Sequence, residues 1–198
     1  MNSFYFDIVA VGLILINIAL GWRFGIVGRA LALGGLYGGV AAATSLGNGV
    51  LRFFGGGGAA NDLYNGAWTF IGITFGVVAA VEILGGLYRD RVEKVISMMF
   101  DRTSGMVAGL VVGVLEAAVV VMVALAVGSA QADFSLAQQL PSHHDDTAKA
   151  VRNSLISSHI AGLDPAMQTF FGPALPASLS SHLADTTAPE TPSPRPGR

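Results

Sequence analysis

Three polar residues inside long apolar stretches are the ones with which this chain could do chemistry: Asn17, Glu82 and Glu116. Between Thr103 and Ala132, Glu116 is the only charged residue. A charged side chain at the centre of a bilayer costs about 2.5–3.5 kcal/mol on insertion scales, so this carboxyl group must be protonated, paired or reached by water. The three residues therefore fit either a polar pathway or proton-sensitive site, or a neutral glutamic acid that hydrogen-bonds one helix to another.

The sequence around Glu116 favours its protonated form. Arg102, the nearest basic residue before it, lies roughly 21 Å away along a helix. No Lys or Arg is expected inside the other apolar stretches. We therefore expect Glu116 to be mainly protonated at neutral pH and to donate a hydrogen bond to a carbonyl group or to Asn17.

The remaining residue types argue against an enzyme, a cofactor and a metal site. The chain has no cysteine, and its "GGGG" run lacks the Lys and Ser/Thr of a phosphate-binding loop. The "HHDD" run at 143–146 is explained more simply by a turn before a helix than by a metal site. Eleven scattered basic residues and a net charge of −2 argue against nucleic-acid binding. All four histidines lie near the C-terminus: His143, His144, His159 and His182.

Long apolar stretches are the elements that must position the polar residues. Hydrophobic residues make up 52% of the 198 residues and charged residues 12%, about half the charge of an ordinary soluble domain. A membrane-spanning helix needs about 20 apolar residues. We therefore predict an all-α polytopic membrane protein, in contact with membrane lipids, with four transmembrane helices at residues 5–22, 26–46, 63–88 and 105–130. A soluble bundle would need polar outer faces, which these stretches lack.

Basic residues cluster in the first and third connections between these helices. Because basic loops stay in the cytoplasm, we predict a multi-pass protein of the bacterial inner membrane with both termini on the extracytoplasmic side. Residues 92–99 carry apolar side chains at helical spacing and fit either a short amphipathic interfacial helix or a solvated connector. The basic residues concerned are Arg23, Arg29, Arg89, Arg91, Lys94 and Arg102, against Arg52 alone in the second connection.

The composition divides the chain into three parts. Residues 1–130 form the expected four-helix transmembrane domain. Residues 131–180 are expected to form a short helical extracytoplasmic segment, with a helix capped near Ser142. Residues 181–198 are rich in Pro, Thr and Ser, which is typical of a disordered tail.

Small residues recur at every fourth position in three of the predicted spans. Lipid tails are as apolar as leucine, so helices associate in a membrane through close packing at such positions rather than through burial alone. The repeats predict a compact bundle or a tight homo-oligomer. The glycines expected at helix contacts are Gly34, Gly38, Gly72, Gly76, Gly105, Gly109 and Gly113.

Three short stretches make the chain resemble the colicin V production protein family of bacterial inner membranes. Asp7 opens the first span in "FDIVAVGLILI" and is followed by "GWRFGIVGR", which is similar to the family's glycine–arginine turn. "FDRTSGMVAGLVVG" and "VRNSLISSHI" resemble two later stretches of the family. The family-like residues are Asp7, Gly21, Arg23, Gly25, Arg29, Asp101 and Arg102.

The resemblance implies a role linked to production or export of a peptide toxin and to envelope maintenance. We expect a membrane scaffold or accessory factor that assembles with itself or with other envelope proteins. The alternative is a small-solute or proton-coupled transport component with Glu116 in its path. Replacement of Glu116 by Gln separates the two, because a scaffold tolerates the change and a proton pathway does not.

Overall fold

All of the secondary structure in the described part of the chain is helical. The computed structural model describes residues 3–53, 59–92, 98–129 and 149–174, and it has no strand within them. The predicted interfacial helix at 92–99 falls largely on residues 93–97, outside the described residues, as do the GGGG run, the HHDD run and the tail from 181 to 198. The elements are α1 (Ser3–Phe53), α2 (Ala59–Val92), α3 (Met98–Ser129), α5 (Leu155–Ala161), α6 (Asp164–Phe171) and η2 (Gly172–Ala174).

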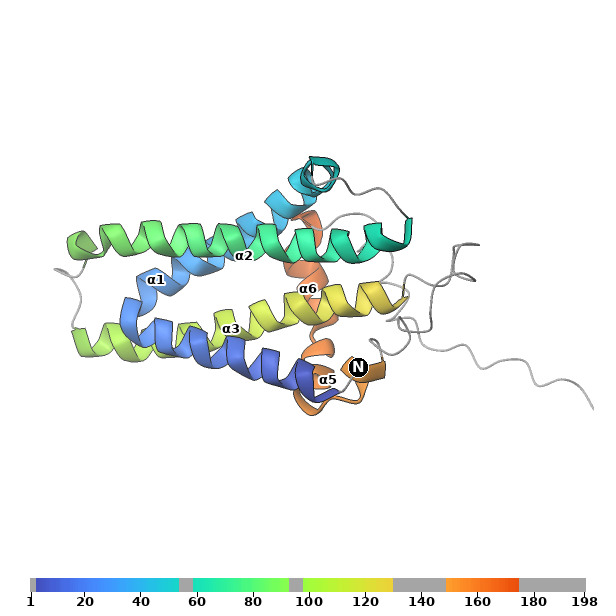
Figure 1. The fold of residues 1–198 in the computed structure, drawn as a ribbon. Helices are drawn as coiled ribbons and strands as arrows, with labels where there is room; N and C mark the ends of the chain where they lie inside the picture. The colour runs from blue at the N-terminus through green and yellow to red at the C-terminus, as the bar shows by residue number, and fades with distance from the viewer. Residues whose placement is uncertain (1–2, 54–58, 93–97, 130–148, 175–198) are drawn as a thin grey trace, which may run out of the picture.

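Helix α1 reverses direction at Gly25 (Figure 1). Gly25 has φ 69° and ψ −173°, a backbone conformation that glycine adopts without the steric cost that a Cβ would bring. We call the parts before and after it limb 1 (residues 3–24) and limb 2 (residues 26–53). The sequence predicted a connection between two separate helices here. The structure instead has continuous helix on both sides of a single non-helical residue.

Three helices are long and apolar enough to cross a membrane. The qualifying segments are Phe4–Gly47, Asn65–Leu87 and Met99–Leu125. The first is 44 residues long, about 66 Å of helix and twice the thickness of a bilayer core. The two limbs of α1 therefore correspond to the first two predicted spans, and α2 and α3 to the third and fourth.

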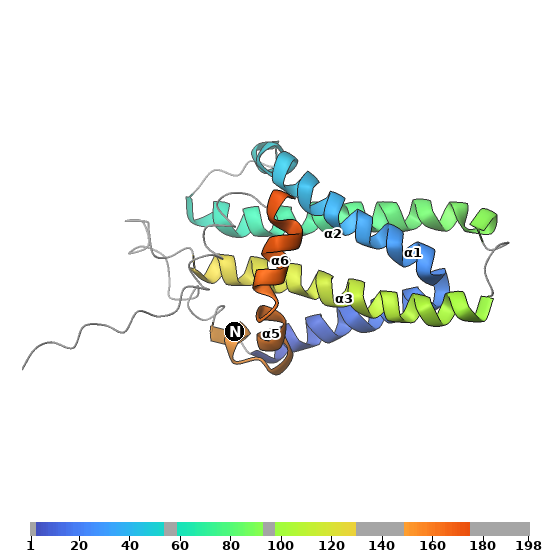
Figure 2. The same ribbon diagram turned by 180° about the vertical axis from the view of Figure 1, so that it is seen from behind.

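Each limb of α1 packs against a different helix. Helix α3 lies along limb 1 and α2 lies along limb 2, as both views in Figures 1 and 2 show. Many large apolar side chains point away from the bundle, including Leu15 and Ile83. Such a surface is expected where lipid tails, and not water, surround the protein.

The C-terminal helices α5 and α6 cross the bundle and do not form a separate unit. Figure 2 shows α6 running across α3 toward limb 2. Met167 and Phe171 on its inner face are buried in one cluster with Leu36 of limb 2 and Met122 of α3. Residues 149–174 thus share a hydrophobic core with the long helices.

Candidate functional site

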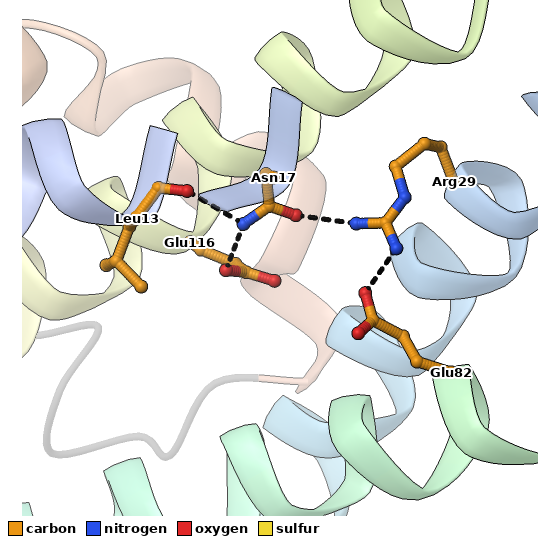
Figure 3. A network of polar contacts seen from close by, with 5 residues as sticks. All are labelled: Leu13, Asn17, Arg29, Glu82 and Glu116. Atoms are coloured by element: carbon orange, nitrogen blue, oxygen red, sulfur yellow. Dashed lines mark hydrogen bonds and ion pairs between the residues drawn. The ribbon is translucent and has the colours of Figure 1, made fainter. Parts of the chain in front are cut away.

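A buried chain of polar side chains joins all four long segments (Figure 3). Nδ2 of Asn17 in limb 1 donates hydrogen bonds to Oε2 of Glu116 in α3 (2.7 Å) and to the carbonyl oxygen of Leu13 (3.0 Å). Nη1 of Arg29 in limb 2 donates to Oδ1 of Asn17 (2.8 Å). Nη2 of Arg29 forms an ion pair with Oε1 of Glu82 in α2 (2.7 Å). The predicted polar residues Asn17, Glu82 and Glu116 therefore belong to one network, together with Arg29.

The side chains of the network are almost completely buried. Arg29 and Asn17 are each 1% exposed and Glu116 is 4% exposed, whereas the side chain of Glu82 is 17% exposed. Charged groups in such a place must be compensated by one another, because neither water nor lipid can do so. The pairing of Arg29 with Glu82 supplies this compensation directly.

Asn17 is chemically suited to its central position. A guanidinium group can only donate hydrogen bonds, and an ionised carboxylate can only accept them. The amide of Asn17 offers one acceptor toward Arg29 and two protons toward Glu116 and Leu13, so each of its polar atoms is used. A single amide therefore connects the guanidinium group of Arg29 to the carboxyl group of Glu116, which come from different helices.

The position of Arg29 corrects two expectations from the sequence. Arg29 is not in a loop, and a basic residue does contact the polar network around Glu116. Because Gly25 is the only non-helical residue at the bend, Arg29 lies one turn inside limb 2 and faces the bundle. A signal was present in the sequence, since the buried residues Ala32 and Leu36 continue the same helical face.

Glycines of α3 bring Glu116 against Asn17. A Cβ at Gly113 would lie 2.7 Å from the Cα of Ile14 and 3.1 Å from the Cβ of Asn17, and one at Gly109 would overlap the carbonyl oxygen of Asn17. Only glycine allows the two backbones to come this close. Glu116 lies one helical turn beyond Gly113 and so faces the same contact.

The bend at Gly25 is held by Asp101 in the first turn of α3. Oδ1 of Asp101 accepts a hydrogen bond from the amide of Ile26 (3.0 Å), the first residue of limb 2. A Cβ at Gly25 would overlap the Asp101 carboxylate, and one at Gly105 would overlap the carbonyl oxygen of Gly21. The family-like residues Gly21, Gly25 and Asp101 thus meet at the point that sets the direction of limb 2, and with it the position of Arg29.

Two arginines of the family-like set lie near the same bend but outside the network. The guanidinium of Arg102 lies 5.7 Å from the ring centre of Trp22. That of Arg23 lies 5.5 Å from the ring centre of Phe24. These distances are typical of cation–π contacts, which an interfacial arginine can make without leaving water.

Asp7 has a structural task at the opposite end of limb 1. Its carboxylate accepts hydrogen bonds from the hydroxyl of Ser154 (2.7 Å) and from the amides of Leu155 (3.1 Å), Ile156 (2.9 Å) and Ser157 (3.3 Å). These are the free donors at the start of α5, so Asp7 caps a helix that lies far away in the sequence. The cap ties α5 to limb 1.

Three of the seven glycines expected at helix contacts meet another helix of this chain, and four do not. Gly105, Gly109 and Gly113 contact limb 1, but a Cβ at any of the other four would meet no described atom within 4 Å. The contact between limb 2 and α2 uses Gly35 and Gly39 instead, and a Cβ at Gly39 would lie 2.6 Å from the carbonyl oxygen of Thr74. The four glycines without such a contact are Gly34, Gly38, Gly72 and Gly76.

The network has the chemistry of a proton-binding group more than that of a metal site. It contains two carboxylates and one guanidinium, so one carboxylate lacks a full counter-charge. Within the described ranges, no three His, Cys, Asp or Glu side chains gather closely enough to hold a metal ion. The chemistry open to the network is therefore hydrogen bonding between helices and uptake of a proton.

Comparison with known proteins agrees with the resemblance found in the sequence. The profile of the family described as colicin V production protein matches residues 6–165, which is most of the chain. A search of curated proteins and a search of solved structures gave no match. The matched region includes Asp7, Gly25, Arg29, Asp101 and the whole polar network. The chain therefore belongs to the colicin V production protein family.

Proposed function

We propose that this protein is a scaffold or accessory factor of the bacterial inner membrane, linked to toxin production or export and to envelope maintenance. The observation that carries the proposal is that the buried charged groups bond to one another across helices. The network connects limb 1, limb 2, α2 and α3 to one another, and both polar atoms of the Asn17 side chain are engaged within it. A fixed bundle of this kind suits a protein that positions others.

Four crossings of the membrane are part of the proposal. The bend at Gly25 returns limb 2 toward the end from which limb 1 starts, and α2 and α3 add one crossing each (Figure 1). An even number of crossings leaves both termini on one side. The bend, the end of α2 and the start of α3 lie at the other end, which carries most of the basic residues and is therefore the cytoplasmic one.

Assembly with a further protein chain would use the glycines that have no contact in this one. Gly34 and Gly38 on limb 2, and Gly72 and Gly76 on α2, are exposed at intervals of one helical turn. Such positions let another helix approach closely. A second copy of this chain or another membrane protein of the envelope would supply that helix.

The test is the mass of the protein purified in a mild detergent, combined with identification of co-purified proteins. The wild type should elute as a complex heavier than the 20.4 kDa chain. Gly38→Leu and Gly76→Leu should release the single chain, because each adds a bulky group where the neighbouring helix is expected. Gly12→Leu is the matched control, since a Cβ at Gly12 also meets nothing within 4 Å and Gly12 belongs to no repeat. A wild type that is a single chain with no companion would contradict the proposal.

A second candidate is a proton-coupled or small-solute transport component that uses Glu116. The observation in its favour is the unequal number of charges, because a carboxylate without a full counter-charge can gain and lose a proton. Glu116→Gln separates the candidates. Under the scaffold proposal this variant keeps its assembly and its activity in cells, whereas a proton pathway would lose its activity while the protein still assembles.

A further inference from the structure

The segment after the last long helix packs at the depth of the membrane core. The rings of Phe170 and Phe171 each lie 6.0 Å, centre to centre, from that of Tyr37 in limb 2. The hydroxyl of Thr44 donates a 2.6 Å hydrogen bond to the carbonyl oxygen of Ala174. Tyr37 and Thr44 both lie inside the apolar segment Phe4–Gly47.

The distance from the bend at Gly25 gives an approximate depth. At about 1.5 Å per residue, Tyr37 lies roughly 18 Å, Thr44 roughly 28 Å and Asp7 roughly 27 Å along their limbs from Gly25. The hydrocarbon core of a bilayer is about 30 Å thick. Residues that contact Tyr37, Thr44 and Asp7 therefore lie at the level of the leaflet opposite the bend.

The outer face of this segment is apolar and exposed. Leu155 is 80% exposed, and Leu163, Ala166 and Phe170 are also exposed. Asp164 is the only Asp, Glu, Lys or Arg from Asn153 to Ala174. A surface facing water would not be expected to lack charge in this way.

Three of the described polar side chains of the segment bond to their own helices. Oγ of Ser158 donates to the carbonyl oxygen of Leu155 (3.2 Å), and Nδ1 of His159 lies 2.7 Å from the same oxygen. Oγ1 of Thr169 donates to the carbonyl oxygen of Pro165 (2.9 Å). The hydroxyl groups of Thr103 and Ser45 in the long helices likewise donate to carbonyl oxygens four residues earlier in their own helices. This pattern satisfies hydroxyl groups where no water is available.

We propose that α5, α6 and η2 form an in-plane element immersed in the leaflet opposite the Gly25 bend, with their outer face covered by lipid acyl chains. Helix α6 runs across the long helices (Figures 1 and 2), so it lies along the plane of the membrane, and Asp7 holds α5 at the end of limb 1. The amides at the start of α5 donate hydrogen bonds to Asp7, and the carbonyl oxygen of Ala174 in η2 accepts one from Thr44. These bonds lower the free energy of placing helix ends in hydrocarbon. This inference rests on the four membrane crossings proposed above and not on the scaffold role; a label at Leu15 that is reached by nickel would count against the crossings themselves.

Spin labels can test the inference, because the chain has no cysteine and each introduced one is unique. Leu155→Cys and Ala166→Cys are labelled with a nitroxide, and the full chain is placed in vesicles of phosphatidylethanolamine and phosphatidylglycerol. Accessibility to oxygen, which enters hydrocarbon, is compared with accessibility to a water-soluble nickel chelate. Leu15→Cys, on the exposed surface of limb 1, gives the value for contact with lipid.

Both labels should be much more accessible to oxygen than to nickel, as is expected for the label at Leu15. A high accessibility to nickel would place the outer face in water and overturn the inference. Low accessibility to both reagents, as expected for a label at the buried Met167, would mean that protein covers this face, and this result would overturn it as well.

Discussion

Asn17 and Glu116 lie 2.7 Å apart, from amide nitrogen to carboxylate oxygen, across a contact in which the backbones of limb 1 and α3 nearly touch. The hydrogen bond and the close packing depend on each other. The glycines of α3 bring the backbones together, and their approach removes water from the polar pair.

Breaking the ion pair of Arg29 and Glu82 should destabilise the protein, whereas replacing both residues by apolar ones should have little effect on its stability. Removing one partner of a buried pair costs about 3–5 kcal/mol, whereas replacing both by apolar groups is often neutral. We expect Arg29→Met to lower the thermal midpoint of the purified protein strongly. The double variant Arg29→Met with Glu82→Leu should regain most of the loss. If the double variant is as unstable as the sum of the two single ones, the two side chains do not act as a pair.

Glu116 should carry the proton of the network at neutral pH. Arg29 neutralises Glu82 through direct contact. Asn17 lies between Arg29 and Glu116, so the carboxyl group of Glu116 has no counter-charge of its own. Infrared difference spectra should show a protonated carboxyl band that disappears in Glu116→Gln. A band that persists in Glu116→Gln would assign the proton to Glu82.

The contact at Gly109 should tolerate no larger side chain. Gly109→Leu places atoms where the carbonyl oxygen of Asn17 lies, so limb 1 and α3 must separate. Overpacking typically costs about 1–3 kcal/mol. We expect a lower yield of folded protein and a lower thermal midpoint. Val107→Leu, on the exposed side of the same helix, should have little effect. Equal effects at both positions would show that the close contact at Gly109 does not hold limb 1 and α3 together.

The cap formed by Asp7 should control the order of α5. Replacing a capping side chain by Ala usually costs about 0.5–2 kcal/mol. Asp7→Ala should therefore speed hydrogen exchange of the amides at Leu155 and Ile156, which lose their acceptor. The amides in the middle of α3 should exchange as before. Unchanged exchange in α5 would show that its packing on α3 and limb 1 holds it without the cap.

The orientation in the membrane can be tested with reporter fusions. Alkaline phosphatase is active only outside the cytoplasm, so a fusion after Arg198 should be active. A fusion after Arg91, at the end of α2, should be inactive, because the basic residues near the bend belong on the cytoplasmic side. The reverse pattern would invert the topology and place the in-plane element in the cytoplasmic leaflet.

Composition and periodicity were sufficient to predict several features of this protein. Apolar stretches predict long helices because a polar backbone must bond internally wherever water is absent. The repeat at Gly105, Gly109 and Gly113 predicts a helix contact, and the residue that follows one turn later, Glu116, falls on the same face. The family was also recognisable from its short motifs, and the profile match confirms it.

The choice between two glycine faces was decided only by the tertiary structure. "GGLYGG" contains both Gly34 with Gly38 and Gly35 with Gly39 at the same spacing. Neighbouring positions on a helix point in directions about 100° apart, so the spacing cannot say which pair meets α2. The structure places the second pair there because limb 2 leaves the bend in a direction fixed by Gly25 and Asp101.

The same bend decided the role of Arg29. In the sequence, an arginine between two apolar stretches looks like a basic residue at the membrane surface, and Arg29 resembles Arg23 in this respect. A reversal confined to one residue starts limb 2 early enough to carry Arg29 inward, where Asn17 and Glu82 already lie. Local sequence determines which segments become helices, but whether a charge meets water or a partner depends on how those helices are placed around it.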